Sequence, residues 1–206
     1  MLALSITDLS YLPELMRSLH CPSREVSLGV PSLRVEGLTK DFADQIAAVK
    51  KAGFTMAPEA ATERLRRVIN KGNSAEDLLR SIETVRAAGW RLLKLYFMIG
   101  LPTETEADIE ALIELIFEAR NAFRGNLNVS LSAFNPKAFT PFQWEGQMSL
   151  KQNRELLKYL QGRVRHRMID LKWHDPETSF LEGVFARGDE RLAEVIVRAS
   201  EQGAYL

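Results

Sequence analysis

The residues best placed to bind a small molecule lie in residues 94–105, KLYFMIGLPTET. An apolar run ends at Gly100 and Pro102, and Thr105 can then cap a helix whose first turn contains Asp108. A buried parallel strand that passes through a short glycine-containing loop into a helix places that loop at the carboxyl edge of the sheet. Ligands of α/β proteins bind at this edge, although the pattern is also typical of an ordinary turn between a strand and a helix.

Comparable polar segments follow the other apolar runs of the sequence. They offer hydrogen-bond acceptors, donors and, at Gly100, a backbone that a flat ligand can approach closely. Together they suit a polar, zwitterionic small molecule that carries a ribose and a base. A single carboxylate after a strand is more often a helix cap or a salt-bridge partner. The segments are Thr7-Asp8, Ser32 with Arg34, Pro58-Glu59, residues 99–104 and residues 135–137.

The short motifs of common enzyme classes are absent from the sequence. It contains no nucleophile elbow, P-loop, dinucleotide-binding glycine motif or zinc-protease motif. The three histidines are far apart, and the single cysteine, Cys21, follows an expected helix beside His20, so we interpret it as an incidental thiol. One cysteine excludes an intrachain disulfide framework and provides no metal-ligand pair. We therefore predict no metal site and assign no catalytic residue.

Alternating strands and helices must position these segments. The run at residues 92–99 is expected to be buried on both faces, and Pro58 is expected to end the strand before it. Strands are expected at residues 2–6, 25–30, 54–57, 92–99, 127–133 and 169–173. Helices are expected at residues 9–19, 39–52 and 64–69, from the cap Ser74 to Gly89, at 105–122, from the capping box Ser149–Gln152 to about 166, and from 177 onward.

This order of elements predicts an α/β fold with a parallel sheet, because strand–helix–strand crossovers are right-handed. Both a doubly wound sheet and a partial (β/α) barrel remain open, since a full eight-unit barrel needs about 250 residues.

The chain has 206 residues with 27 basic and 27 acidic side chains, so its formal net charge of zero argues against nucleic-acid or anionic-membrane binding. No apolar run reaches transmembrane length, and the first residues carry no basic segment typical of a signal peptide. The single cysteine favours a reducing cytoplasm.

Several segments, taken in order, resemble the radical S-adenosylmethionine (SAM) superfamily, and within it the members with an upstream cobalamin-binding domain. The resemblance implies a TIM-like partial (β/α) barrel at residues 1–175, truncated at its N-terminus, and a C-terminal helical extension at residues 176–206. The segments are PSLRVEGL, FTMAPEAATERLRRVINKGNSAEDLL, GWRLLKLYFMIGLPTET, FNPKAFTPFQWE and SFLEGVFARGDERLAEVI.

Members of that family hold a 4Fe–4S cluster through a C-x-x-x-C-x-x-C loop and cleave SAM to methionine and a 5′-deoxyadenosyl radical, which abstracts hydrogen from a substrate. By resemblance, Thr7-Asp8 would contact the SAM amino group and Glu59 its ribose or amino-acid part. Arg64 would pair with the SAM carboxylate, which a guanidinium can grip in two places. Ile99, Gly100 and Leu101 would follow the adenine, and Asn135 would lie on the adenine's other side.

Two departures from the family pattern limit what the resemblance implies. The chain has no C-x-x-x-C-x-x-C, and one cysteine cannot hold a four-iron cluster. In addition, Ala60-Ala61 stands where relatives place a glycine, which puts the backbone dihedrals of that turn in doubt. We therefore expect a fragment that lacks the first strand–helix unit, is inactive alone and holds neither SAM, the cluster nor cobalamin firmly.

Other interpretations remain open. The chain could be a complete small α/β protein that binds a nucleotide-like ligand or a protein partner without radical chemistry. A methylthiotransferase-type RNA modifier is a weaker alternative, because it predicts a basic face and the charge balance is neutral. An unpaired strand at residues 2–6 would favour self-association through that edge.

Overall fold

The computed structural model describes Glu14, Ser18 and residues 53–204. Glu14 and Ser18 are both helical, within the segment where a helix is expected at residues 9–19. The remaining expectations for the first part of the chain lie outside the described residues: the strands at 2–6 and 25–30, the helix at 39–52, Cys21, and the candidate residues Thr7 and Asp8.

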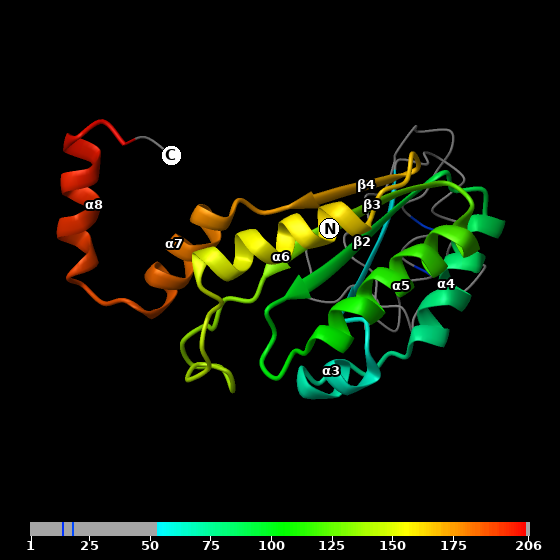
Figure 1. The fold of residues 1–206 in the computed structure, drawn as a ribbon, viewed down its shortest axis with the longest axis horizontal. Helices are drawn as coiled ribbons and strands as arrows, with labels where there is room; N and C mark the ends of the chain where they lie inside the picture. Colours follow the sequence, from blue (N-terminus) through cyan, green and yellow to red (C-terminus); the bar gives the residue numbers. More distant parts are fainter. Residues whose placement is uncertain (1–13, 15–17, 19–52, 205–206) are drawn as a thin grey trace.

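Four parallel strands form one sheet in the described part of the chain (Figure 1). Their spatial order follows their order in the sequence, so these four strands contain no point at which the winding reverses. A doubly wound sheet reverses there, whereas a barrel winds in one direction. The observed order therefore fits the expected partial barrel. The strands are β1 (Phe54–Glu59), β2 (Leu92–Ile99), β3 (Asn126–Ala133) and β4 (Ile169–Trp173).

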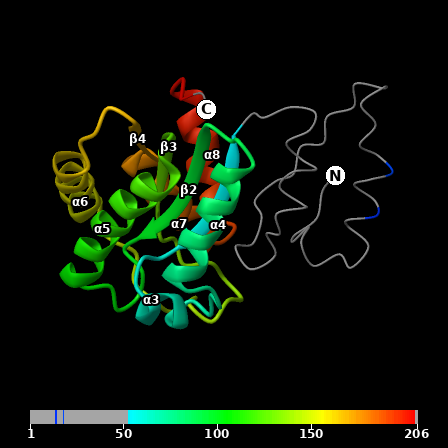
Figure 2. The ribbon, with the colours of Figure 1, turned by 90° about the vertical axis from the view of Figure 1, so that its right-hand side faces the viewer.

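Helices cover one face of this sheet. Figures 1 and 2 show α4, α5 and α6 along that face, and apolar side chains of all three helices join those of the strands in one buried core. α3 lies at the carboxyl end of β1 (Figure 1). The helices are α3 (Glu63–Val68), α4 (Ala75–Ala87), α5 (Glu106–Phe123) and α6 (Leu150–Arg163).

The two faces of the sheet differ in burial. On β2, Leu93, Leu95, Phe97 and Ile99 are fully buried under the helices, whereas Tyr96 on the other face is 39% exposed. The prediction that residues 92–99 are buried on both faces is therefore wrong within the described structure. The side chains of a strand alternate between faces, and the helices α4 to α6 pack on one face of this one.

The predicted N-terminal caps of three helices are confirmed. Ser74 forms the capping box that starts α4, Ser149 forms the one that starts α6, and Thr105 forms one with Asp108 at α5.

The prediction that Pro58 ends its strand is wrong, because β1 continues to Glu59. β1 is an edge strand among the four described, and its register shifts between Met56 and Glu59. Edges and bulges are where a sheet tolerates a residue without an N–H group.

The expected C-terminal helix is divided in two. α7 (Pro176–Arg187) starts at the cap Asp175, whose carboxylate accepts the Thr178 N–H at 2.8 Å, and α8 (Leu192–Glu201) follows the segment 188–191. α8 contains no buried residue and projects from the rest of the molecule (Figure 1). None of the described helices is long and apolar enough to span a membrane.

Candidate functional site

Three of the candidate residues meet at one edge of the sheet. Glu59, Ile99 and Asn135 stand at or just beyond the carboxyl ends of β1, β2 and β3, which are neighbouring parallel strands. Ile99 is in register with Ala133, and its carbonyl oxygen accepts the Phe134 N–H at 2.8 Å. This edge, called the carboxyl edge below, is the ligand-binding edge of α/β folds.

Glu59 turns the chain at the end of β1. Its φ of 67° is left-handed, and the N–H of Ala60 then bonds to the carbonyl oxygen of Pro58 at 2.9 Å. The left-handed residue of this turn is therefore Glu59, so the doubt about Ala60-Ala61 does not hold. Burial raises the pKa of the Glu59 carboxyl, and the Lys71 ammonium, 3.6 Å from its Oε1, opposes that rise.

The segment after β2 presents backbone to the carboxyl edge. Ile99 and Leu101 turn their side chains into apolar clusters, with 1% and 3% of their surface exposed. Between them, Gly100 has a φ of 72°, and a Cβ on it would lie 2.6 Å from Cε of Met148. The left-handed dihedral angle favours glycine here, whereas the Met148 methyl ends a flexible side chain that could move aside. A ligand at this segment would therefore contact its backbone N–H and C=O groups rather than its side chains.

The carboxylate of Glu104 already accepts a hydrogen bond from one of these peptide groups. The Gly100 N–H donates to Oε2 of Glu104 at 2.6 Å, and the Glu104 N–H donates to the Leu101 carbonyl oxygen at 3.0 Å. Burial raises the pKa of the Glu104 carboxyl to about 7, against the effect of the Gly100 hydrogen bond. The carboxyl therefore changes charge near neutral pH, directly beside the segment proposed to bind adenine. Glu104 was predicted as part of the polar segment after β2, but its raised pKa depends on burial that no sequence pattern indicates.

Arg64 lies on α3 and reaches across to the loop after β2. Its guanidinium donates to Oγ1 of Thr103 at 3.0 Å and to the Thr103 carbonyl oxygen at 2.8 Å, and it forms an ion pair with Asp108. Arg64 is 47% exposed. Three of its five N–H donors are used in this way, which leaves two for a ligand.

Asp108 is the centre of a polar network that sequence reasoning missed. Only 5% exposed, it accepts the Thr62 hydroxyl at 2.6 Å, the Thr105 N–H at 2.8 Å, the Thr105 hydroxyl at 2.6 Å and the Arg64 guanidinium. Burial alone would raise the pKa of Asp108, but the hydrogen bonds from Thr105, Thr62 and Arg64 hold that pKa at about 2. Asp108 is therefore an anion that fixes α3 to the start of α5.

Asn135 is held by side chains from later in the chain. Its Nδ2 donates to Oε2 of Glu182 at 2.9 Å, and its Oδ1 accepts Nε2 of Gln147 at 2.5 Å. Glu182 also accepts the Lys137 ammonium at 2.5 Å. Gln147 packs against Gly183 of α7, where any Cβ would collide with it. The amide of Asn135 is thus oriented by α7, and no pattern in the sequence signalled Gln147 or Glu182.

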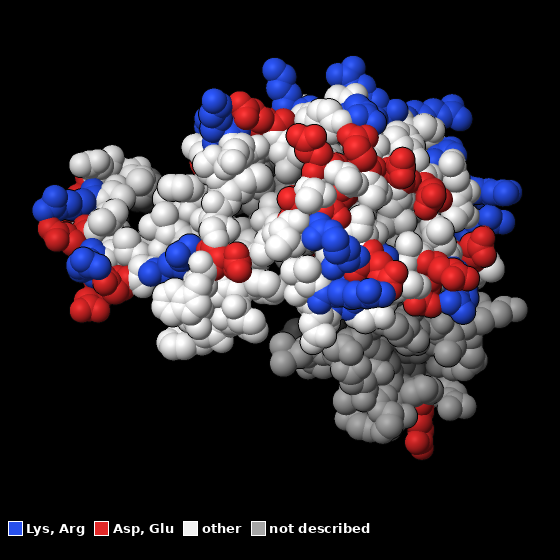
Figure 3. Space-filling view, turned by 60° about the horizontal axis from the view of Figure 1, so that its bottom comes forward, with Lys and Arg blue, Asp and Glu red and all other residues white. Residues whose placement is uncertain are grey.

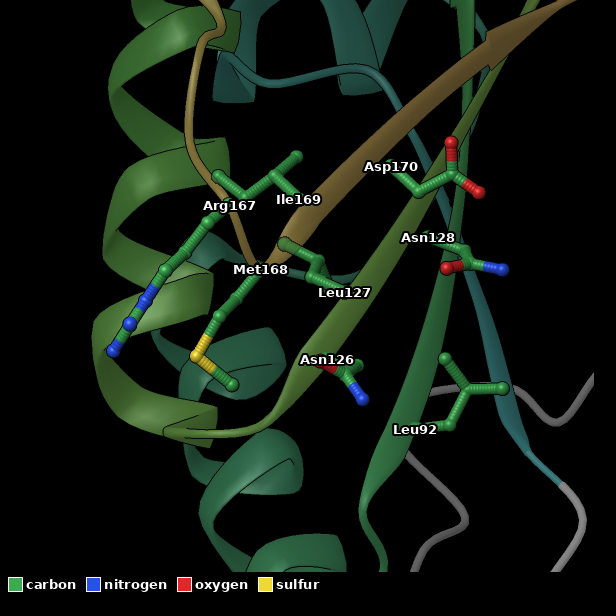
Figure 4. A pocket seen from close by; sticks show the side chains of 8 residues that line it. All are labelled: Leu92, Asn126, Leu127, Asn128, Arg167, Met168, Ile169 and Asp170. Carbon is green, nitrogen blue, oxygen red and sulfur yellow. The ribbon is translucent and has the colours of Figure 1, made fainter.

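A hollow of about 440 Å³ opens at the opposite edge of the sheet (Figure 4). Residues near the amino ends of β2, β3 and β4 line it, among them Asn126, Met168 and Asp170. In parallel barrels, residues at the amino ends of the strands serve stability, and the chemistry takes place at the carboxyl ends. This hollow is therefore separate from the candidate site.

The surface charge and the candidate metal ligands also bear on what the described residues can bind. Figure 3 shows basic and acidic side chains interspersed on the viewed face, in keeping with the net charge of zero. Within the described residues, no group of three or more histidine, cysteine, aspartate or glutamate side chains could hold a metal ion.

Comparisons with known proteins point to one family. The family model "Radical SAM superfamily" matches residues 5–116. The chain is 31% identical over 196 residues to uncharacterized protein MJ0966 of Methanocaldococcus jannaschii, covering 95% of this chain and 42% of that protein. It is 33% identical over 99 residues to a tRNA-2-methylthio-N(6)-dimethylallyladenosine synthase of Cereibacter sphaeroides, covering 40% of this chain and 23% of that enzyme. It therefore spans less than half of either relative.

A solved structure has a similar fold. The archaeal Elp3 of Methanocaldococcus infernus, with an N-terminal deletion, superposes with a TM-score of 0.57 at 11% sequence identity. The match covers 73% of this chain and 40% of the Elp3 chain. At this identity the likeness concerns the fold alone, and it agrees with an open, barrel-like α/β sheet.

Proposed function

Because the chain belongs to the radical SAM superfamily, we propose that it forms the SAM-binding part of an enzyme that reductively cleaves SAM and abstracts hydrogen from a substrate. One observation carries the proposal. Glu59, the backbone of Gly100 and Asn135 stand along the carboxyl edge of three adjacent parallel strands. The two interpretations without radical SAM chemistry, a nucleotide-binding protein and a partner-binding protein, have no comparable support.

The groups along this edge have the chemistry that SAM requires. The half-buried carboxylate of Glu59 can accept hydrogen bonds from ribose hydroxyls or from the SAM amino group. The peptide groups of Ile99, Gly100 and Leu101 can follow the adenine, and the oriented amide of Asn135 would lie on its other side. Arg64 would bind the SAM carboxylate through the two donors that Asp108 and Thr103 leave unused.

The iron–sulfur cluster needs ligands that this chain does not contain. In the family, the bound cluster supplies the electron for SAM cleavage. A 4Fe–4S cluster is held by three or four thiolates, and the sequence has one cysteine. We therefore assign the cluster ligands to sequence outside these 206 residues. A cobalamin-binding domain in the same parent protein remains an expectation from the family resemblance.

The proposal is tested in the parent protein with its cluster in place. Under anaerobic conditions with dithionite, we expect SAM to yield methionine and 5′-deoxyadenosine, measured by liquid chromatography and mass spectrometry. Glu59→Ala should lower the initial rate about tenfold or more, the effect of losing one charged hydrogen bond. Glu83→Ala, an exposed position on α4, is the matched control and should leave the rate unchanged. Absence of 5′-deoxyadenosine from protein with a full cluster content would refute the proposal.

A further inference from the structure

The helix α7 packs against the segment that joins β3 to α6. Gln147, in this segment, donates from Nε2 to the carbonyl oxygen of Ser179 at 2.8 Å. The guanidinium of Arg187 donates to the carbonyl oxygen of Glu145 at 3.2 Å. Figure 1 shows α7 beside the N-terminal end of α6, where this segment enters the helix. α7 therefore holds the segment in place, although it follows the last described strand of the sheet.

Two consecutive residues of this segment contact the two places that are proposed to bind adenine. The Met148 side chain lies over Gly100, since a Cβ there would be 2.6 Å from its Cε. Gln147 donates from Nε2 to Oδ1 of Asn135 at 2.5 Å. Gly100 follows β2 and Asn135 follows β3, which are neighbouring strands. The segment held by α7 thus adjoins the candidate site at both strand ends.

The amide of Asn135 has one orientation in this network. A carboxylate only accepts hydrogen bonds, so Nδ2 faces the Glu182 oxygen at 2.9 Å and Oδ1 faces Gln147. The hydrogen bond from Lys137 holds the pKa of Glu182 below its usual range, so Glu182 is charged at neutral pH. These partners use one of the two N–H groups and one of the two lone pairs of the amide. One N–H and one lone pair remain for a ligand.

Gly183 provides the space that the Gln147 amide occupies. A Cβ at position 183 would overlap Oε1 of Gln147. Glycine lowers the stability of a helix interior relative to alanine, and Gly183 is one of the buried residues of α7. The overlap is with the end of a flexible side chain, so α7 can still form when the Gln147 amide moves away. A side chain at position 183 would therefore displace Gln147 from Asn135 without unfolding the protein.

We propose that Gln147 is a positioning residue of the SAM site, which together with α7 holds the Asn135 amide in the orientation that binds adenine. The inference rests on the proposed function, because Asn135 would contact adenine and Gln147 acts only through Asn135. An edge of adenine presents a ring nitrogen that accepts and an amino group that donates, and an asparagine amide matches this pair with one N–H and one lone pair. An amide that turns or moves loses the match.

The affinity of the cluster-containing parent protein for SAM tests this role. Equilibrium dialysis gives the dissociation constant of SAM, and formation of 5′-deoxyadenosine at saturating SAM gives the rate of cleavage. Gln147→Ala and Gly183→Ala should each raise the dissociation constant about fivefold, the effect of one hydrogen bond. The rate at saturating SAM should fall less than the affinity, because adenine is remote from the bond that breaks. Gly162→Ala, on α6 where an added Cβ meets open space, is the matched control and should change neither quantity.

A double variant shows whether position 183 acts through Gln147. Gln147→Ala combined with Gly183→Ala should bind SAM no more weakly than Gln147→Ala alone, since no amide is left to displace. In the 206-residue chain without SAM, each single variant should shift the NMR signals of the Asn135 side-chain amide, and Gly162→Ala should leave them unchanged. Additive losses of affinity in the double variant would contradict the inference.

The outcomes separate this inference from the proposed function. SAM cleavage with wild-type affinity in the folded Gly183→Ala protein would refute only the inference, and this variant decides even if Gln147→Ala does not fold. SAM binding that weakens in Gly183→Ala but not in Gly162→Ala, without any cleavage by the wild type, would refute only the proposed function. A wild-type parent protein that binds no SAM would overturn both.

Discussion

Replacing Asp108 by alanine is expected to lower the free energy of unfolding by about 3 kcal/mol. The substitution removes the acceptor of the Thr62 hydroxyl, of the Thr105 N–H and hydroxyl, and of the Arg64 guanidinium. Most of the cost arises because four partly buried hydrogen bonds at the junction of α3 and α5 are lost together, although the exposed Thr105 and the half-exposed Arg64 can in part be rehydrated. Chemical denaturation by urea, followed by circular dichroism, measures the change.

Asp77 provides a matched control for Asp108. It occupies the same capping-box position in α4, where it bonds to the backbone and hydroxyl of Ser74 and pairs with Arg80, all within one helical turn. Asp77→Ala should therefore lower the free energy of unfolding by much less than Asp108→Ala, because it removes only an exposed helix cap. The difference between the two variants isolates the contacts that join α3 to α5. Equal losses of stability would contradict the network described around Asp108.

The second large effect is a pH dependence of stability that comes from Glu104. Burial raises the pKa of its carboxyl from 4.5 to about 7 in the folded protein. The folded state therefore holds this proton more tightly than the unfolded state, and the stability that the group contributes is fully present below pH 4.5. It is lost as the pH rises towards and through 7, by about 2 kcal/mol once partial exposure is allowed for.

Glu104→Gln should remove this dependence. The free energies of unfolding of variant and wild type should agree near pH 4.5, and the variant should be more stable by about 2 kcal/mol near pH 8. The pKa of the nearby Asp108 is about 2, so Asp108 does not titrate in this window. Glu118→Gln, an exposed position on α5, is the control. Parallel stability curves for wild type and Glu104→Gln between pH 4.5 and 8 would show that Glu104 is not the titrating group.

Features that depend on neighbouring residues were predictable from the sequence. The caps Ser74 and Ser149 and the run of β2 are local signals, and the structure places them as expected. The rule that polar residues follow parallel strands also led to Glu59, Gly100 and Asn135, which the structure places along one edge. Their roles toward SAM remain predictions.

Contacts between distant segments were not predictable. Asp108 is 46 residues from Thr62 and 44 from Arg64 in the sequence, and no periodicity links residues so far apart. The open face of β2 could have been found, because Lys94 and Tyr96 are two positions apart in an otherwise apolar run. That spacing places both side chains on one face of a strand, and a face with a lysine is seldom fully buried.

The most direct test of a SAM site at the carboxyl edge is amide hydrogen exchange of the cluster-containing parent protein, with and without SAM. We expect slower exchange in peptides containing Gly100, Leu101 and Asn135 when SAM is bound. Peptides at the amino ends of β2 and β3, beginning at Leu92 and Asn126, should exchange at unchanged rates. Slower exchange confined to those amino-end peptides, while equilibrium dialysis shows SAM to be bound, would rule out a SAM site at the carboxyl edge.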